Sequence, residues 1–272
     1  MPDQKLTSAL PDALTAPRTR ALTLCGVLVA ALFGVAAFVP LPYTLTVPGV
    51  TADTLGDYQG RPVLTITGAP LRPVDGQLRM VTISATNQDE RTGLWRALQA
   101  WADPAEAVRP TDTVYPKSDP VKSEQENAQQ MVESQDSATL AALSYLHLSP
   151  EQVKVDVDLG DIGGPSAGQM LALGIVDRLG GDGKGGGLTG GRTIAGTGTI
   201  DAQGNVGEVG GVPLKTRAAA RDGASVFLLP RGECSEAKVN TPDGLRLVPV
   251  DTLAESVAAL EALESGGAVP SC

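Results

Sequence analysis

An apolar run near the N-terminus constrains this chain more than any other feature. Residues 21–39, ALTLCGVLVAALFGVAAFV, contain no charged side chain. A helix of about 20 apolar residues, rising about 1.5 Å per residue, spans a hydrocarbon core about 30 Å thick. A helix buried in a globular protein is rarely this long and apolar on every side. The run therefore predicts a transmembrane helix over residues 21–40, preceded by a tail of residues 1–20.

The residues that flank this run predict its orientation. Arg18 and Arg20 precede it, whereas Pro40, Pro42 and an acidic body follow it. Because basic residues favour the cytosolic side, we expect a single-pass protein of the cell membrane, with a cytosolic N-terminus and an extracytoplasmic body. A cleaved signal peptide, with residues 35–37 as its cleavage site, is the alternative, although apolar regions of signal peptides span only about 7–15 residues.

The composition excludes several classes of function. A formal charge of -10, from 21 Lys and Arg against 31 Asp and Glu with no basic cluster, argues against a nucleic-acid partner. The single histidine, His147, excludes a histidine-rich metal site, and the three cysteines have no Cys-x-x-Cys spacing. The sequence has no phosphate-binding loop of the form G-x-x-x-x-G-K-[ST]. We therefore expect no metal and no other cofactor.

Two of the three cysteines lie in the body and can form a disulfide. Cys25 falls within the apolar run, whereas Cys234 and Cys272 lie where an extracytoplasmic location allows disulfides to persist. A bridge between Cys234 and Cys272 would fasten the C-terminal tail, residues 266–272, to the body. Two unpaired thiols are the alternative.

The body divides into a small β-rich part, residues 41–122, and a part with alternating helices and strands, residues 123–265. In the first part, Leu and Trp at helical spacing over 91–102 predict a short helix whose tryptophans pack inside, with a binding face as the alternative. The second part begins with a long amphipathic helix over 123–146. Together the segments predict an α+β fold with an α/β-like mixed sheet. Its further elements are a strand over 153–159, helices over 165–179 and 213–222, a hairpin around 201–204, strands over 225–229 and 245–250, and a last helix; Ser123 and Asp251 are candidate helix caps.

The most informative local motif is Gly163-Gly164-Pro165-Ser166-Ala167-Gly168, between a predicted strand and an apolar helix. Glycines allow close backbone approach, and Pro165 suits a first helical turn. Ser166 then stands at the positive end of a helix, where free N–H groups can hold an oxyanion. Taken alone, the motif also fits a serine that only caps a helix.

A nucleophilic serine needs a base. We interpret His147 as an ordinary histidine at a helix end, which leaves a lysine or a carboxylate for this role. Lys215 follows two glycines and apolar neighbours in the first turn of a predicted helix. Burial and the positive helix end both disfavour its ammonium form, so that a neutral Lys215 can accept the Ser166 proton. A solvated surface lysine is the alternative.

These motifs resemble a known family. In order and approximate spacing they are similar to the proteolytic domain of Lon-type proteases, which are Ser–Lys dyad peptidases, most strongly over about residues 130–265. The resemblance implies that Ser166 is the nucleophile, Lys215 the general base and Thr197 the residue that orients the lysine amine. It also implies an oxyanion hole in the backbone of Gly164, Pro165 and Ser166. The segments that carry it are Gly164-Pro165-Ser166-Ala167-Gly168, Thr197-Gly198, Gly210-Gly211 with Lys215 four residues beyond, and residues 223–230.

The whole chain resembles more closely the membrane-anchored Lon-like proteases of actinobacteria and bacilli, which lack the ATPase domain. The sequence departs from the family pattern in several places, which include Thr199 where the family often has Glu and a longer loop over 180–191. Cytosolic Lon has an acidic residue directly before its Gly-Pro-Ser, where this chain has Gly163, so Asp161 is the candidate supporting acid. Only residues 147–152 join the long helix to the next strand, too few for the PDZ domain that these relatives commonly carry there.

The resemblance implies a membrane-anchored, ATP-independent serine endopeptidase that hydrolyses unfolded or flexible extracytoplasmic polypeptides. Its expected partners are those polypeptides, the membrane through residues 21–40, and further copies in a hexamer-like ring or a partner that bears a PDZ domain. Because a fold does not dictate a function, the alternative is an anchored scaffold or interaction protein that keeps the Lon-type fold with weak catalysis. A hydrolase of non-peptide amides is a third reading.

Overall fold

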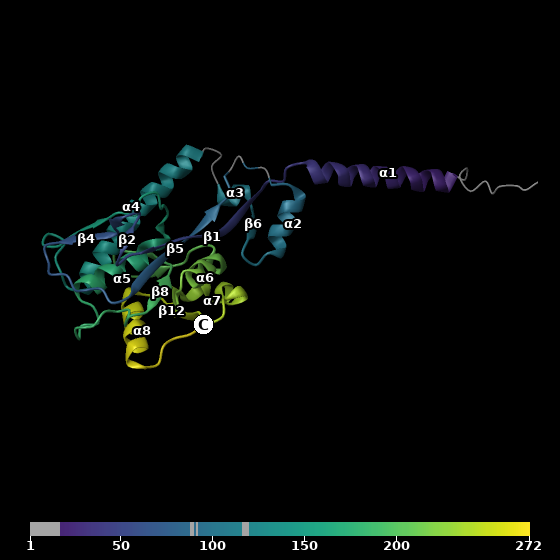
Figure 1. Ribbon diagram of the computed structural model, residues 1–272. Coiled ribbons are helices and arrows are strands. Elements are labelled where there is room, and N and C mark those ends of the chain that lie inside the picture. The colour runs from purple at the N-terminus through teal and green to yellow at the C-terminus, as the bar shows by residue number, and fades with distance from the viewer. Residues whose placement is uncertain (1–16, 88–89, 91, 116–119) are drawn as a thin grey trace, which may run out of the picture.

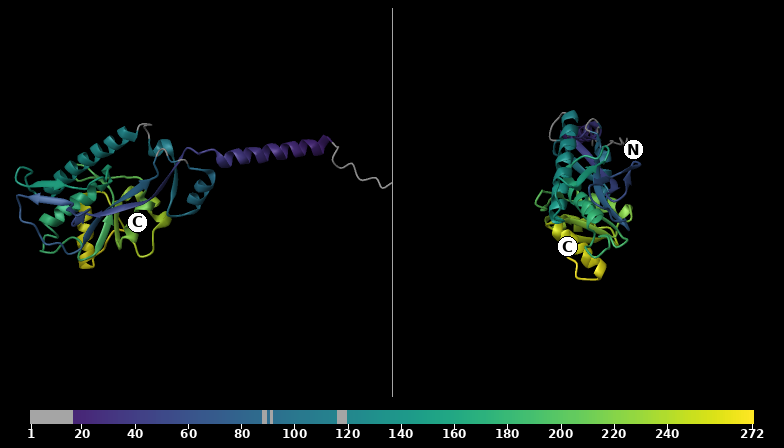
Figure 2. Two further views of the ribbon diagram at one scale, coloured as in Figure 1. Left: turned by 45° about the horizontal axis from the view of Figure 1, so that its top comes forward. Right: turned by 90° about the vertical axis from the view of Figure 1, so that its left-hand side faces the viewer.

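The computed structural model of the protein describes residues 17–87, 90, 92–115 and 120–272. Helix α1 (Pro17–Phe38) projects from one end of the body (Figure 1), and the two further views of Figure 2 show the same arrangement. Within the described residues, α1 is the one helix long and apolar enough to cross a membrane, and none of its residues is buried. It ends two residues before Pro40, consistent with the tendency of the residue before a proline to leave the helical conformation.

The body is built around a six-stranded sheet in the order β12-β11-β8-β5-β1-β6. β5, β8, β11 and β12 run parallel to one another, whereas β1 is antiparallel to both β5 and β6. The predicted mixed sheet is confirmed, and it joins strands from the β-rich part to strands of the later part. The bounds are β1 (Tyr43–Asp53), β5 (Gln77–Ala85), β6 (Ala107–Pro110), β8 (Thr193–Gly196), β11 (Val226–Pro230) and β12 (Arg246–Val250).

Helices cover both faces of this sheet, as the alternation along β11 shows. Val226 and Leu228 belong to a core shared with α4 (Pro120–Tyr145), α5 (Gly168–Leu179) and α8 (Leu253–Ser265). Phe227 and Leu229 belong to a second core shared with α6 (Val212–Arg221) and α7 (Cys234–Ala237). Because successive side chains of a strand point to opposite faces, the two cores lie on opposite sides of the sheet. Burial on both faces explains why β11 is apolar throughout.

The remaining elements are short. β4 pairs with β7 and β2 with β3, and β9 pairs with β10 in the predicted hairpin. Asp201 closes that hairpin, since its Oδ1 accepts from the backbone N–H groups of Gln203 and Asn205. The bounds are β2 (Asp57–Tyr58), β3 (Arg61–Pro62), β4 (Leu64–Thr67), β7 (Lys154–Val157), β9 (Thr199–Ile200), β10 (Val206–Gly207), α2 (Leu94–Ala102), α3 (Thr111–Val114), η1 (Pro165–Ala167), η2 (Arg231–Glu233) and η3 (Lys238–Asn240).

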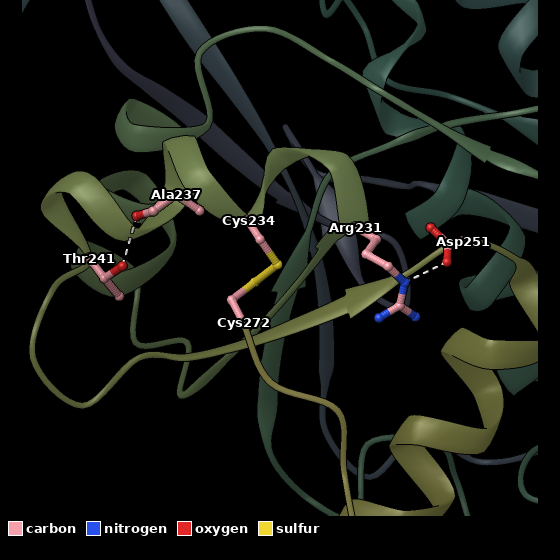
Figure 3. Close-up of a disulfide and its surroundings, with 6 residues drawn as sticks. All are labelled: Arg231, Cys234, Ala237, Thr241, Asp251 and Cys272. Carbon is pink, nitrogen blue, oxygen red and sulfur yellow. Dashed lines mark hydrogen bonds and ion pairs between the residues drawn. A yellow bond between two sulfur atoms is a disulfide. The ribbon is translucent and has the colours of Figure 1, made fainter.

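Both predicted helix caps are wrong. Ser123 lies inside α4, because that helix already begins at Pro120. The N-cap of α8 is Thr252, whose Oγ1 accepts the N–H of Glu255 at 3.1 Å. Asp251 instead pairs through Oδ2 with Arg231 Nε at 2.6 Å, as Figure 3 shows. Asp is in general a better N-cap than Thr, but the Asp251 side chain is engaged by Arg231, which is distant in sequence.

The prediction that the two tryptophans of α2 pack inside is also wrong. Trp95 and Trp101 are 73% and 80% exposed, and the buried residues of this helix are Ala97 and Ala100. α2 contacts β1, β6 and the end of α1. It presents its small side chains to the body and its large apolar ones outward.

Candidate active site

Ser166 lies in η1, the single 3-10 turn that leads into α5. Gly164, just before this turn, has a φ of +93°, which glycine adopts without strain. Pro165 occupies the first position of the turn, where its missing N–H leaves no bond unmade. Ser166 is thereby held partly exposed at the N-terminal end of α5.

Helix α4 holds the Ser166 loop in place. Ser134 Oγ on α4 donates to the carbonyl oxygen of Pro165 at 3.0 Å. At Gly168, an added Cβ would lie 2.8 Å from Ser134 Oγ and 2.9 Å from Ile200 Cγ2, closer than packed atoms approach. The glycine therefore allows α5 to begin directly against both α4 and β9.

Thr197 connects the segment of Ser166 with that of Lys215. It follows β8 and is fully buried. Its hydroxyl accepts from Lys215 Nζ at 3.0 Å and donates to the carbonyl oxygen of Ser166 at 3.2 Å. The N–H of Gly198 donates to that same carbonyl at 3.0 Å. Three segments far apart in the sequence thus meet at one hydroxyl, although no hydrogen bond joins Ser166 Oγ to Lys215 Nζ among the described residues.

Lys215 is buried, with 3% of its surface exposed. It lies in the first turn of α6, after Gly211, whose φ of +73° starts the helix. Burial lowers the pKa of Lys215 to about 8, and the negative charges of Glu233 and Glu236 oppose this shift. The alternative of a solvated surface lysine does not hold in this structure.

The carboxylates that act on Lys215 are Glu233 and Glu236 rather than Asp161. Glu233 lies in η2 with 8% of its surface exposed, and its Oε1 accepts the N–H of Val209 at 3.0 Å. Burial raises the pKa of Glu233, whereas the bond from Val209 and the charge of Lys215 lower it. Asp161 is exposed on the loop before Gly163 and lines a surface hollow.

The residue that follows Glu233 forms a disulfide. Cys234 and Cys272 are bridged, with their Cα atoms 5.4 Å apart, and the bridge fastens the C-terminal tail to α7 (Figure 3). On the other side of Glu233, Arg231 pairs with Asp251. The short segment that carries Glu233 is therefore held at both ends.

Of the three backbone positions expected in the oxyanion hole, Ser166 alone offers an N–H without a partner among the described residues. The N–H of Gly164 donates to the carbonyl of Asn127 at 3.1 Å. Pro165 has no N–H. The N–H of Ser166 belongs to the first positions of the turn, which have no partner within it.

Two surface hollows flank the Ser166 loop along α4. The larger, of about 590 Å³, lies before Gly164, and the smaller, of about 160 Å³, lies beside Pro165. The larger hollow is lined by Glu124, Asn127, Ala128 and residues 160–163, and the smaller by Gln130, Glu133, Ser134, Ser137, Pro165, Thr199 and Ile200.

Among the described residues, no group of three or more His, Cys, Asp or Glu side chains is placed to hold a metal ion.

Comparison with protein families agrees with this arrangement. A family model described as the Lon protease (S16) C-terminal proteolytic domain matches residues 119–262. The match spans more than half of the chain and includes Ser166, Thr197 and Lys215. The chain therefore belongs to the Lon protease (S16) family of serine proteases, and residues 119–262 correspond to the proteolytic domain of that family.

Proposed function

We propose that this protein is a membrane-anchored, ATP-independent serine endopeptidase in which Ser166 is the nucleophile and Lys215 the general base. The observation that carries the proposal is the buried position of Lys215, whose Nζ lies 3.0 Å from Thr197 Oγ1. With a pKa of about 8, roughly a tenth of Lys215 is neutral at pH 7, which suffices for a base that acts near neutral pH.

In the proposed reaction, Ser166 Oγ attacks the carbonyl carbon of the scissile peptide while neutral Lys215 takes the Oγ proton. The N–H of Ser166 stabilises the oxyanion of the tetrahedral intermediate. The Lys215 ammonium then protonates the leaving amine, and an ester between Ser166 and the acyl group remains. Lys215 next takes a proton from water, which attacks the ester, and the proton returns to Ser166 Oγ.

Thr197 positions the lysine for these steps. A neutral amine has two N–H bonds and one lone pair. Because Thr197 Oγ1 accepts one N–H and donates its own proton to the Ser166 carbonyl, the lysine remains anchored without its lone pair being used. The lone pair is then available to the serine proton.

The proposed substrates are unfolded or flexible extracytoplasmic polypeptides. The chain has no phosphate-binding loop of the form G-x-x-x-x-G-K-[ST], and the proposed reaction needs no nucleotide. Arg18 and Arg20 before the apolar part of α1 support an extracytoplasmic body, and so does the Cys234–Cys272 disulfide. Further copies of the chain in a ring, or a PDZ-bearing protein, are the proposed partners.

One observation favours the alternative of an anchored scaffold with weak catalysis. Among the described residues, Ser166 Oγ makes no hydrogen bond to Lys215 Nζ. Hydrogen bonds between catalytic groups are often long in free enzymes and tighten when substrate binds, so we prefer the protease.

Proteolysis of an unfolded model protein by the purified full-length chain tests the proposal. Ser166→Ala and Lys215→Ala should each abolish cleavage, whereas Lys154→Ala, which removes an exposed lysine of β7, should leave the rate unchanged. Circular dichroism would show that each variant is folded. Cleavage that persists in folded Lys215→Ala would contradict the proposed base, and a folded wild type without activity would favour the scaffold.

A further inference from the structure

Helix α2 carries an apolar face that is largely exposed. Trp95, Leu98 and Trp101, called here the Trp95–Trp101 face, are 73%, 45% and 80% exposed. At 3.6 residues per turn, these side chains lie within an arc of about 120° on one side of the helix. Ala97 and Ala100, on the side that faces the body, are buried.

The helix itself carries one charge, which is paired, and the carboxylates of Asp103 and Glu90 also lie near it. The only charged residue of α2 is Arg96, and both terminal nitrogens of its guanidinium donate to the Glu106 carboxylate, at 2.6 and 2.8 Å. α2 therefore offers no free charge of its own to a partner. The side chains of the Trp95–Trp101 face can therefore bind a partner only through apolar contact.

The covalent connection to α1 places this face beside the apolar helix. α1 ends at Phe38, and the N–H of Leu41 donates to the carbonyl of Thr92 at 2.9 Å, two residues before α2 begins. Three residues of extended chain reach at most about 11 Å. α1 and α2 contact each other, and Figure 1 shows α2 beside the end of α1 that meets the body.

Apolar side chains are exposed along the chain that joins the two helices. Phe38 and Val39, at the end of α1, are exposed. A hollow of about 290 Å³ lies between the chain that follows them and α2. Its lining consists of Leu41, Tyr43, Leu94, Ala97, Leu98, Trp101 and Val108.

We propose that the Trp95–Trp101 face docks on the surface of the bilayer that α1 spans, on the side of the body. The headgroup zone extends roughly 5–8 Å beyond the hydrocarbon core, which is within reach of the linker. Trp is enriched at this depth because its ring is apolar and its N–H can still find a polar partner. Docking of this kind requires that α1 spans a membrane, as proposed above. The body would then be held at the bilayer both by α1 and by the Trp95–Trp101 face.

The two tryptophans make the face directly observable. They are the only tryptophans of the chain, so tryptophan emission of the full-length protein reports on this face alone. The protein would be reconstituted into phosphatidylcholine vesicles, either plain or brominated near the carbonyl or near the methyl end of the acyl chains. We expect about a twofold loss of emission with the shallow bromine and a smaller loss with the deep bromine.

The apolar character of the Trp95–Trp101 face gives a second expectation. Replacing part of the lipid with phosphatidylglycerol, or raising the salt concentration, should leave the quenching by bromine unchanged, because the contact is apolar. Leu98→Glu keeps both tryptophans and should remove most of the quenching. Val239→Glu, a matched change at an exposed apolar residue of η3, should leave it intact.

The outcomes separate docking from anchoring. Equal emission in plain and brominated vesicles, from a chain that resists extraction by alkaline carbonate, would overturn docking and leave the anchor in place. Insensitivity to bromine combined with protection from aqueous iodide would also overturn it, because a protein then covers the face. Extraction of the chain by carbonate would contradict the membrane span and docking together.

Discussion

Lys215 Nζ and Thr197 Oγ1 lie 3.0 Å apart, and both side chains are almost completely buried. Within the part of the chain that the structure describes, this contact gives a desolvated amine one neutral partner and no charged hydrogen-bond acceptor. The Thr197 hydroxyl also donates to the carbonyl of Ser166 at 3.2 Å, so the position of the proposed base is linked to the segment of the proposed nucleophile.

Removing the Thr197 hydroxyl should impair catalysis through the lysine. In Thr197→Val, Lys215 loses its acceptor and the Ser166 carbonyl loses a donor, and we expect kcat to fall about 10²-fold, within the range of one positioned proton-transfer group. Thr197→Ser keeps the hydroxyl and should retain most activity. If the Val and Ser variants unfold at the same denaturant concentration and lose kcat equally, the Thr197 hydroxyl does not position Lys215 for catalysis.

Glu233 should set the working pH of the site. Its negative charge raises the pKa of Lys215, so Glu233→Gln should lower that pKa and move the rise of kcat/KM to lower pH. Asp161→Asn, which changes the acid expected from the family pattern, should leave the profile in place. A shift produced by Asp161→Asn and not by Glu233→Gln would reverse this assignment.

The burial of Lys215 should also appear in the pH dependence of stability. Its pKa is about 8 in the folded protein and 10.5 in the unfolded chain, so that between these values the unfolded state binds more protons and stability rises with pH. Below pH 8 the charge of the buried ammonium lowers the free energy of unfolding by up to about 3 kcal/mol. Lys215→Met should therefore be more stable than wild type at pH 7, and the difference should shrink by pH 10. Denaturant titrations at both pH values measure it, and a constant difference would contradict the shifted pKa.

The disulfide should contribute substantially to the stability of the body. It closes a loop with a sequence separation of 38, for which loop-closure entropy predicts about 4 kcal/mol. The double variant Cys234→Ser, Cys272→Ser should lower the free energy of unfolding by up to this amount, whereas Cys25→Ser, at an exposed position of α1, should not. An unfolding midpoint unchanged by the double variant would show that the bridge does not constrain the chain.

The site residues that can be predicted from this sequence are those with a local signature. Gly164 and Pro165 prepare the turn of Ser166, and Gly211 starts the helix of Lys215, so both positions are recognisable without knowledge of the fold. Alternating and helical periodicity likewise predicts the mixed sheet and its covering helices. These signals lie within a few residues of the position that they describe.

The features that could not be predicted depend on contacts between distant segments. Glu233 acts on Lys215 only because η2 and α6 come together on one face of the sheet, and the sole nearby sequence signal is the adjacent Cys234. The apolar pattern of α2 has the same period whether Trp95 and Trp101 face a core or the outside. The sequence pattern therefore predicts the helix, and only the fold shows which side is free.

The reaction of Ser166 with a fluorophosphonate, followed as a function of pH, tests the central claim most directly. If Lys215 is the base, the rate constant for labelling should rise about tenfold per pH unit and level off above pH 8, as the pKa of about 8 requires. Labelling should be absent in Ser166→Ala, and slow and independent of pH in folded Lys215→Met. A wild-type rate that does not vary between pH 6 and 9, or an unchanged rate in Lys215→Met, would contradict the proposed Ser–Lys dyad.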